Sequence, residues 1–123
     1  MENLPSKELL SAVLGFGVRS FDINPNKTLI SYVKDNASVS NFTSINIYEL
    51  MHKCKEWAMQ NGWHINSKVY EDGGIAGLTD NEGSMELLSC IERFPADSEP
   101  EAVLKATQWI YDKLQEYKDG NFK

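Results

Sequence analysis

The feature that most constrains the fold is an apolar face at helical spacing between Ile47 and Asn61. Asn46 precedes this segment, and Glu49 stands three residues after Asn46. This spacing is a variant of the capping box with Asn in place of Ser or Thr. Gly62 stands where a left-handed residue commonly ends a helix. The apolar positions follow i, i+3 and i+4 spacing, at Ile47, Leu50, Met51, Cys54, Trp57 and Ala58. The segment therefore predicts an amphipathic helix with one face turned to the core.

A second amphipathic helix is predicted from Glu99 to Tyr117. Ser98 and Glu101 match the Ser-x-x-Glu capping box, and Pro100 falls in the first turn, where its missing N–H costs little. The inner stripe consists of Val103, Ala106, Thr107, Ile110 and Leu114, with Leu104 and Tyr111 flanking it on one side and Trp109 on the other. This apolar arc is broader than one contact face usually needs. The tail, residues 118–123, is expected to be frayed.

The N-terminal third predicts a short helix followed by a pair of strands. Residues 6–14 carry a leucine and valine stripe, and Gly15 and Gly17 end that helix. Residues 18–23 and 28–33 are predicted strands, because β-branched and aromatic residues flank the turn formed by Asn24, Pro25, Asn26 and Lys27. The polar stretch of residues 34–43 is predicted to be a flexible loop.

Further strands are predicted after the central helix. Residues 63–69 alternate, with Trp63, Ile65 and Val69 on one face and His64 and Asn66 on the other. Residues 75–78 and 85–94 are extended segments around the turn at residues 80–83, and the second is apolar on both faces, as in the middle of a sheet. The predicted fold class is α+β: a small antiparallel or mixed β-sheet of about four to five strands, two main amphipathic helices and the short N-terminal helix.

Length and composition are those of one small domain. The 123 residues, 41% of them hydrophobic, suffice for a single core spanning residues 1–123. No apolar run approaches the roughly 20 residues that span a bilayer, and no basic segment followed by an apolar stretch opens the chain. We therefore expect a cytoplasmic protein with no membrane association. The two cysteines, Cys54 and Cys90, are expected to be buried, unreactive thiols.

The net charge of −6 is unevenly distributed along the chain. Nine acidic residues stand against Arg93 alone between Glu71 and Glu101. The candidate acidic surface comprises Glu71, Asp72, Asp80, Glu82, Glu86 and Glu92. Because basic residues drive phosphate binding, direct binding to nucleic acid is not expected. The acidic stretch could face a basic partner or mimic nucleic acid, and the simpler interpretation is a solvated surface.

The order of elements resembles that of small phage and prophage-encoded proteins with a phage α/β/α sandwich domain. The shared marks are the Gly15-Phe16 break behind the first helix and the turn from Asp97 into the helix containing Ala106. The resemblance spans residues 7–114, excluding the loop at residues 34–43 and the acidic middle. It implies a phage or prophage origin and a bacterial host cell. The family has no assigned activity, so the resemblance implies no catalytic residues.

No pattern of residues predicts catalysis, a metal site or a cofactor. The four possible soft metal ligands are His52, Cys54, His64 and Cys90, which lack the C-x-x-C or H-x-x-x-H spacing of a zinc site. His52 and Cys54 lie two residues apart, so a helix places them on nearly opposite faces. The glycines around Gly73 and Gly83 are not followed by the Gly-Lys-Ser/Thr of a phosphate loop.

The sequence therefore predicts a non-enzymatic phage or prophage accessory protein that binds another protein or a second copy of itself. The candidate interface residues are Trp109, Leu104, Tyr111 and Met59, because aromatic residues and Met are enriched at interfaces. For Trp57 and Trp109 the alternative is a place in the core. The alternative function is that of an acidic inhibitor or nucleic-acid mimic that binds a basic host protein.

Overall fold

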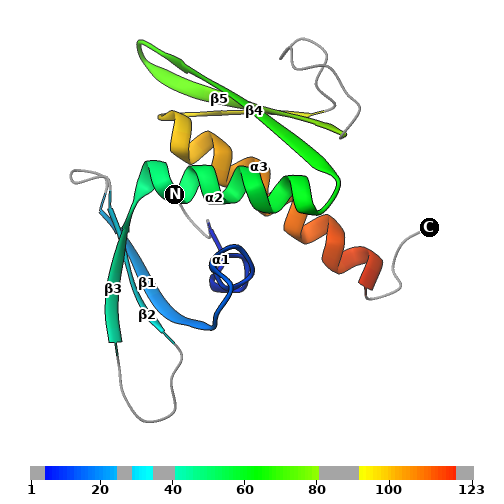
Figure 1. Ribbon diagram of the computed structural model, residues 1–123. Coiled ribbons are helices and arrows are strands. Elements are labelled where there is room, and N and C mark those ends of the chain that lie inside the picture. Colours follow the sequence, from blue (N-terminus) through cyan, green and yellow to red (C-terminus); the bar gives the residue numbers. More distant parts are fainter. Residues whose placement is uncertain (1–4, 25–28, 35–40, 81–91, 119–123) are drawn as a thin grey trace.

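The computed structural model describes residues 5–24, 29–34, 41–80 and 92–118. Along the chain these residues form α1 (Lys7–Leu14), β1 (Val18–Asn24), β2 (Leu29–Lys34), β3 (Asn41–Asn46), α2 (Ile47–Gln60), β4 (Trp63–Tyr70), β5 (Gly73–Asp80), β6 (Glu92–Ala96) and α3 (Glu99–Lys118) (Figure 1). The α+β class and the three helices are as predicted from the sequence.

The strands form two antiparallel sheets, where the sequence predicted one sheet of four to five strands. The first sheet has the order β1-β2-β3 and the second has the order β4-β5-β6. Val18 pairs with Lys34 and Asn24 with Leu29, so the first two strands form the predicted hairpin. The chain leaves the first sheet through α2, and β4 then begins the second sheet. Each half of the chain therefore builds its own three-stranded meander.

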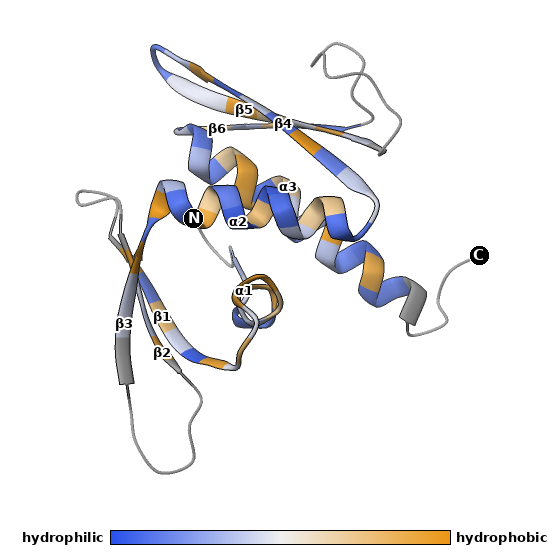
Figure 2. Cartoon of the chain, in the orientation of Figure 1, coloured by the Kyte–Doolittle hydropathy of each residue, from blue (hydrophilic) through white to orange (hydrophobic). Residues whose placement is uncertain are grey.

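Helices α2 and α3 lie between the two sheets, and α1 packs beside them (Figure 1). Helix α3 contacts all three strands of the second sheet, while α1 contacts β1 and α2 contacts β3. Apolar and polar residues alternate along α2 and α3 (Figure 2). One buried cluster joins the helices to both sheets: Leu10, Val18, Ile30, Tyr32, Ile45, Ile47, Leu50, Cys54, Ala58, Ile65, Ala76, Leu78, Ala102, Val103, Leu104, Ala106 and Ile110. No helix in the described part of the chain is long and apolar enough to cross a membrane.

Local capping fixes the helix ends, as the sequence predicted. The Asn46 side chain accepts a hydrogen bond from the Tyr48 amide at 2.8 Å, and Gly62 follows α2 with a positive φ of 87°. At α3 the Ser98 hydroxyl accepts a hydrogen bond from the Glu101 amide at 3.3 Å. Helix α1 is also tied to α3, because the Ser6 amide donates to Gln108 Oε1 at 2.8 Å.

Two sequence predictions about strands are corrected by the structure. Residues 41–43, predicted as part of a loop, belong to β3, which pairs with β2 from Leu29–Asn46 to Lys34–Asn41. The second correction concerns the segment at residues 85–94, predicted inside the sheet. Its described part belongs to β6, and among the described residues β6 pairs with β5, which occupies the middle of the second sheet. Residues 81–91 lie outside the described part of the chain, and they include Cys90 and the predicted turn after its first residue, Asp80. Residues 25–28, 35–40 and 119–123 lie outside it as well.

Cys54 is completely buried on the inner face of α2. Burial raises the pKa of Cys54 to about 12 from its ordinary value of 9.0, and a hydrogen bond with Thr107 opposes part of this shift. Because the folded chain holds this proton more tightly than the unfolded chain, the contribution to stability is complete below pH 9.0 and is lost as the pH rises through about 12.

The burial of Cys54 predicts that its thiol does not react in the folded chain. We expect a Cys90→Ser variant, which leaves Cys54 as the single cysteine, to be inert to a disulfide reagent at about pH 8, since the thiolate is the reactive form. The same variant should react completely after unfolding in denaturant. The absorbance of the thiol that the reagent releases measures the reaction of the folded variant and of the unfolded variant. Rapid reaction of the folded variant would contradict the buried position.

Candidate functional site

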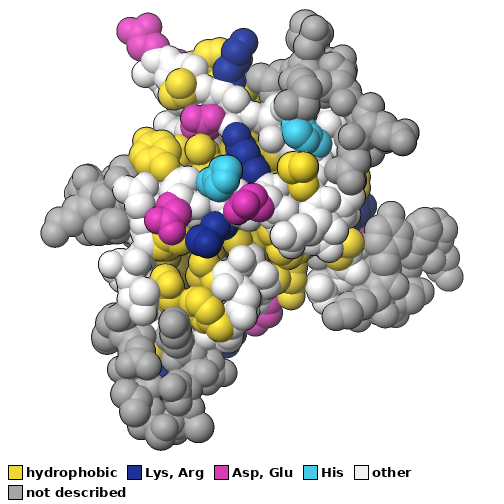
Figure 3. Space-filling model, in the orientation of Figure 1, with side chains coloured by type: hydrophobic (Ala, Val, Ile, Leu, Met, Phe, Trp, Pro, Cys, Tyr) yellow, Lys and Arg dark blue, Asp and Glu magenta, His cyan; other side chains and the backbone are white. Residues whose placement is uncertain are grey.

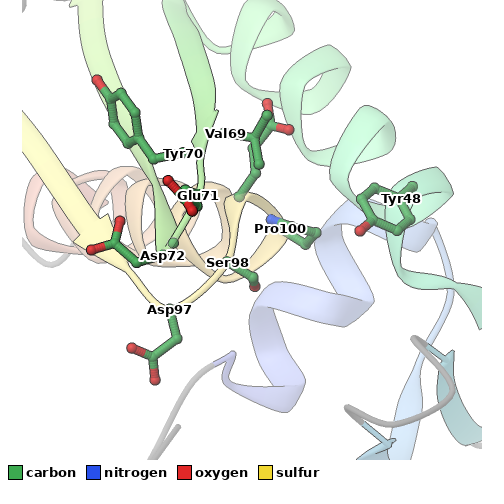
Figure 4. A pocket seen from close by; sticks show the side chains of 10 residues that line it. Tyr48, Val69, Tyr70, Glu71, Asp72, Asp97, Ser98 and Pro100 are labelled. Carbon is green, nitrogen blue, oxygen red and sulfur yellow. The ribbon is translucent and has the colours of Figure 1, made fainter.

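An open groove of about 580 Å³ lies at one end of the second sheet. Three parts of the chain that are distant in sequence form it: the first turn of α2, the β4–β5 hairpin, and the entry to α3. Its lining residues are Tyr48, Val69, Tyr70, Glu71, Asp72, Gly73, Asp97, Ser98, Glu99 and Pro100. Figure 4 shows Tyr48 and Pro100 on one side of this groove and Asp72 and Asp97 on the other.

A glycine lets the start of α3 lie directly against β5. A Cβ atom at Gly74 would lie 2.5 Å from the Glu99 amide nitrogen and 2.8 Å from the carbonyl carbon of Ser98. Gly74 also pairs with Ala96 of β6, the strand that leads into α3. The absence of a side chain at Gly74 therefore lets the α3 N-terminus lie beside the hairpin, where it forms a wall of the groove.

A chain of hydrogen bonds holds the three elements of the groove together. Lys55 Nζ of α2 donates to Ser67 Oγ of β4 at 2.7 Å, and Ser67 donates in turn to Glu99 Oε2 of α3 at 2.5 Å. The hydroxyl thus links an ammonium group to a carboxylate across three elements. Hydrogen bonds to charged groups are stronger than those between neutral groups. This linkage fixes the entry of α3 relative to α2 and β4.

Removing the central hydroxyl should destabilise the protein measurably. A Ser67→Ala variant is expected to lose about 1 kcal/mol of unfolding free energy, because both charged partners then lose a hydrogen bond in a half-buried place. Urea denaturation measures the loss. Ser44→Ala is the matched control, since Ser44 is an exposed strand residue whose change should stay within about 0.5 kcal/mol. Equal stability of the two variants would contradict the linkage.

Three large apolar side chains around the groove are exposed to solvent. Tyr48 is 51% exposed, Val69 68% and Tyr70 51%. The sequence predicted Val69 on the same face of the strand as Trp63 and Ile65, and burial along β4 ends before Val69. On the face shown in Figure 3, hydrophobic side chains lie among acidic, basic and histidine side chains. We name Tyr48, Val69 and Tyr70 the apolar rim.

Three carboxylates of the groove have no cationic partner within the described part of the chain. Glu71 and Asp72 lie in the β4–β5 turn and Asp97 precedes α3, and all three are exposed. Neither ion pair found among the described residues, His52–Glu56 or Lys113–Glu116, involves them. No lysine, arginine or histidine lines the groove. We name Glu71, Asp72 and Asp97 the acidic rim.

The candidate acidic surface predicted from the sequence is divided between two places. Glu71 and Asp72 lie at the groove, whereas Glu92 lies at the other end of β6, four residues or about 13 Å from Ala96. Asp80 ends β5, and Glu82 and Glu86 lie outside the described residues. Asp97, which was not part of the predicted acidic surface, lies at the groove with Glu71 and Asp72.

The candidate interface residues also separate. Leu104 is 1% exposed and belongs to the core, so its predicted place in an interface is corrected. Trp109 is half-buried, with its ring 5.4 Å from that of Trp63 and beneath the Lys113 ammonium. Tyr111 is half-buried near Trp57, with ring centroids 6.4 Å apart. Only Met59, 56% exposed near the end of α2, is fully on the surface.

The histidines and cysteines do not come together in the described part of the chain. His52 is exposed beside Glu56 at 3.9 Å, and Cys54 is buried on the opposite side of α2. No group of three His, Cys, Asp or Glu side chains able to hold a metal ion occurs among the described residues.

Comparison with known proteins found no matching family model, no matching curated protein and no matching solved structure. The resemblance to the phage α/β/α sandwich domains therefore stays a prediction from the sequence.

Proposed function

We propose that the protein is a non-enzymatic accessory protein that binds another protein through the groove. The observation that carries this proposal is the apolar rim, three large side chains that are each at least half exposed around one concavity. Exposed apolar side chains that gather in one place, bordered by polar groups, are typical of protein-binding sites. Tyrosine in particular is enriched among the residues that dominate binding energy.

The shape of the groove supports a protein partner over a small molecule. Small-molecule sites enclose most of their ligand's surface. This groove is an open depression between the first turn of α2, the β4–β5 hairpin and the entry to α3 (Figure 4). A segment of another protein can lie along such a surface without being enclosed.

A phage or prophage role extends this proposal, and a second copy of the chain is the alternative partner. The resemblance in element order and in the turn from Asp97 supports the first. The alternative function, an acidic inhibitor or nucleic-acid mimic, is supported by the acidic rim. It receives less support from Glu92, which lies at the other end of the sheet rather than in one continuous array.

Affinity capture with matched variants tests the proposed binding surface. A chain carrying Tyr48→Ala and Tyr70→Ala should recover at least about tenfold less partner from a lysate of the source organism than the wild type, because two exposed aromatic contacts are lost. Met59→Ala is the control, since it truncates an equally exposed side chain away from the groove lining. Unfolding midpoints of all three chains check that they remain folded.

Equal recovery by the three chains would refute the proposed surface. Loss with Met59→Ala alone would move the interface to the far end of α2. Sedimentation of the purified wild-type chain tells whether the captured partner is another protein or a second copy.

A further inference from the structure

We propose that the groove takes a basic segment of the partner protein, with an apolar side chain against the apolar rim and lysine or arginine side chains on the acidic rim. This inference rests on the proposed function, since it names the chemistry of the partner at the same surface. The two rims provide the two halves of the recognition.

The apolar rim and Pro100 contact the apolar side chain of the partner and exclude water from that contact. Tyr48 comes from α2, Val69 and Tyr70 from the end of β4, and Pro100 from the first turn of α3. Pro100 is buried, so it forms a rigid wall, while the other three project into solvent. An apolar side chain of the partner placed between Tyr48, Val69 and Pro100 would remove part of their surface from water, which is favourable in proportion to the area covered.

The acidic rim selects a partner segment with positive charge. Glu71, Asp72 and Asp97 approach the groove from the hairpin and from the α3 entry, and none has an ion-pair partner in the described part of the chain. Glu99 also lines the groove, but it accepts the Ser67 hydrogen bond and so already has a partner. Like charges gathered at one concavity repel one another, and a cationic segment relieves that repulsion.

The same charges disfavour the other occupants. A nucleic acid would bring phosphates against three carboxylates. A second copy of this chain carries a net charge of −6, so two copies repel each other over their whole surfaces. A basic segment of another protein fits the charge and the exposed apolar side chains together.

Peptide binding measured by fluorescence anisotropy tests this inference. The probes are three labelled octapeptides: one alternating lysine and leucine, one alternating lysine and glycine, and one alternating glutamate and leucine. The lysine–leucine peptide should bind most tightly, because only it satisfies both rims. Its affinity should fall with added salt, since contacts between exposed charges are screened beyond about 10 Å at 0.1 M ionic strength.

Two double variants with the same change in net charge separate the groove from the overall acidity. Asp72→Asn with Asp97→Asn removes two acids of the acidic rim, and Asp22→Asn with Glu92→Gln removes two exposed acids elsewhere. The first should weaken binding of the lysine–leucine peptide about tenfold, as expected for two rim charges, and the second less than about twofold.

Equal weakening by both double variants would overturn the inference, because attraction to overall charge would then explain binding. Preference for the glutamate–leucine peptide would overturn it as well. If the aspartate variants keep the captured partner while the tyrosine variants lose it, the proposed function stands and the basic segment is refuted. Sedimentation showing a dimer that the Asp72→Asn and Asp97→Asn changes strengthen would identify a second copy as the occupant instead.

Discussion

A Gly74→Ala variant is expected to lose about 3 kcal/mol of unfolding free energy, at the upper end of the usual cost of overpacking. The added methyl group would lie 2.5 Å from the Glu99 nitrogen and 2.6 Å from the Glu99 Cα. Each atom it meets belongs to the backbone, so no side chain can rotate away. Relief requires α3 to move off β5, which also strains the hydrogen bond between Ser67 and Glu99.

Gly62→Ala is the control for this variant. Gly62 has a φ of 87° and no atom within 4 Å of the added Cβ, so its change costs only the left-handed strain of about 1 kcal/mol. Urea denaturation of the two variants should show the larger loss at Gly74. A smaller loss at Gly74 than at Gly62 would contradict the close approach of α3 to β5. Peptide binding by the folded Gly74→Ala chain should also weaken, because α3 forms one wall of the groove.

The helices were predictable because their signals are local. Asn46 and Ser98 cap helices within three residues of their own positions, and Gly62 ends α2 through its own backbone conformation. Each signal depends on neighbours in sequence alone, so no knowledge of the tertiary structure is needed to interpret it.

The strands were less predictable, because contacts with distant parts of the chain determine which segments become strands and which of their residues are buried. Strand β3 consists mainly of Asn, Ser and Thr. It lies at the edge of the first sheet, where a strand needs fewer apolar side chains than in the middle of a sheet. Val69 continues the alternation of Trp63 and Ile65, yet it is exposed because burial along β4 ends before it. The division into two sheets depends on where α2 packs, which no strand pattern contains.

The groove could not be predicted, because its walls come from residues 48, 69–73 and 97–100. The sequence did signal part of it, through the acidic residues at 71 and 72. Asp97 looked like part of a helix-starting turn, and Gly74 was only one of several neighbouring glycines. Their joint effect follows from the contact between β5 and the start of α3, which forms only in the folded chain.

A Leu104→Ala variant is expected to lose about 3 kcal/mol of unfolding free energy, within the range for truncating a buried leucine. Leu104 is 1% exposed in the cluster that joins the helices to both sheets, so the smaller side chain leaves a cavity. The sequence placed it with Met59 in one interface, and the structure separates them. The same measurement on Met59→Ala should show a change within about 0.5 kcal/mol, as is usual for a surface position.

Together, the Leu104→Ala and Met59→Ala variants show whether Leu104 belongs to the core or to the protein surface. Loss of stability in Leu104→Ala, with stability kept in Met59→Ala, is the result that burial requires. If Leu104→Ala instead kept the wild-type stability and lost partner binding, Leu104 would be an interface residue and the packing of α3 against α2 and the second sheet would be wrong. Because partner binding needs a folded chain, capture should be compared at a temperature where both variants remain native by circular dichroism. Under that condition a core residue changes stability while leaving the groove's binding surface in place.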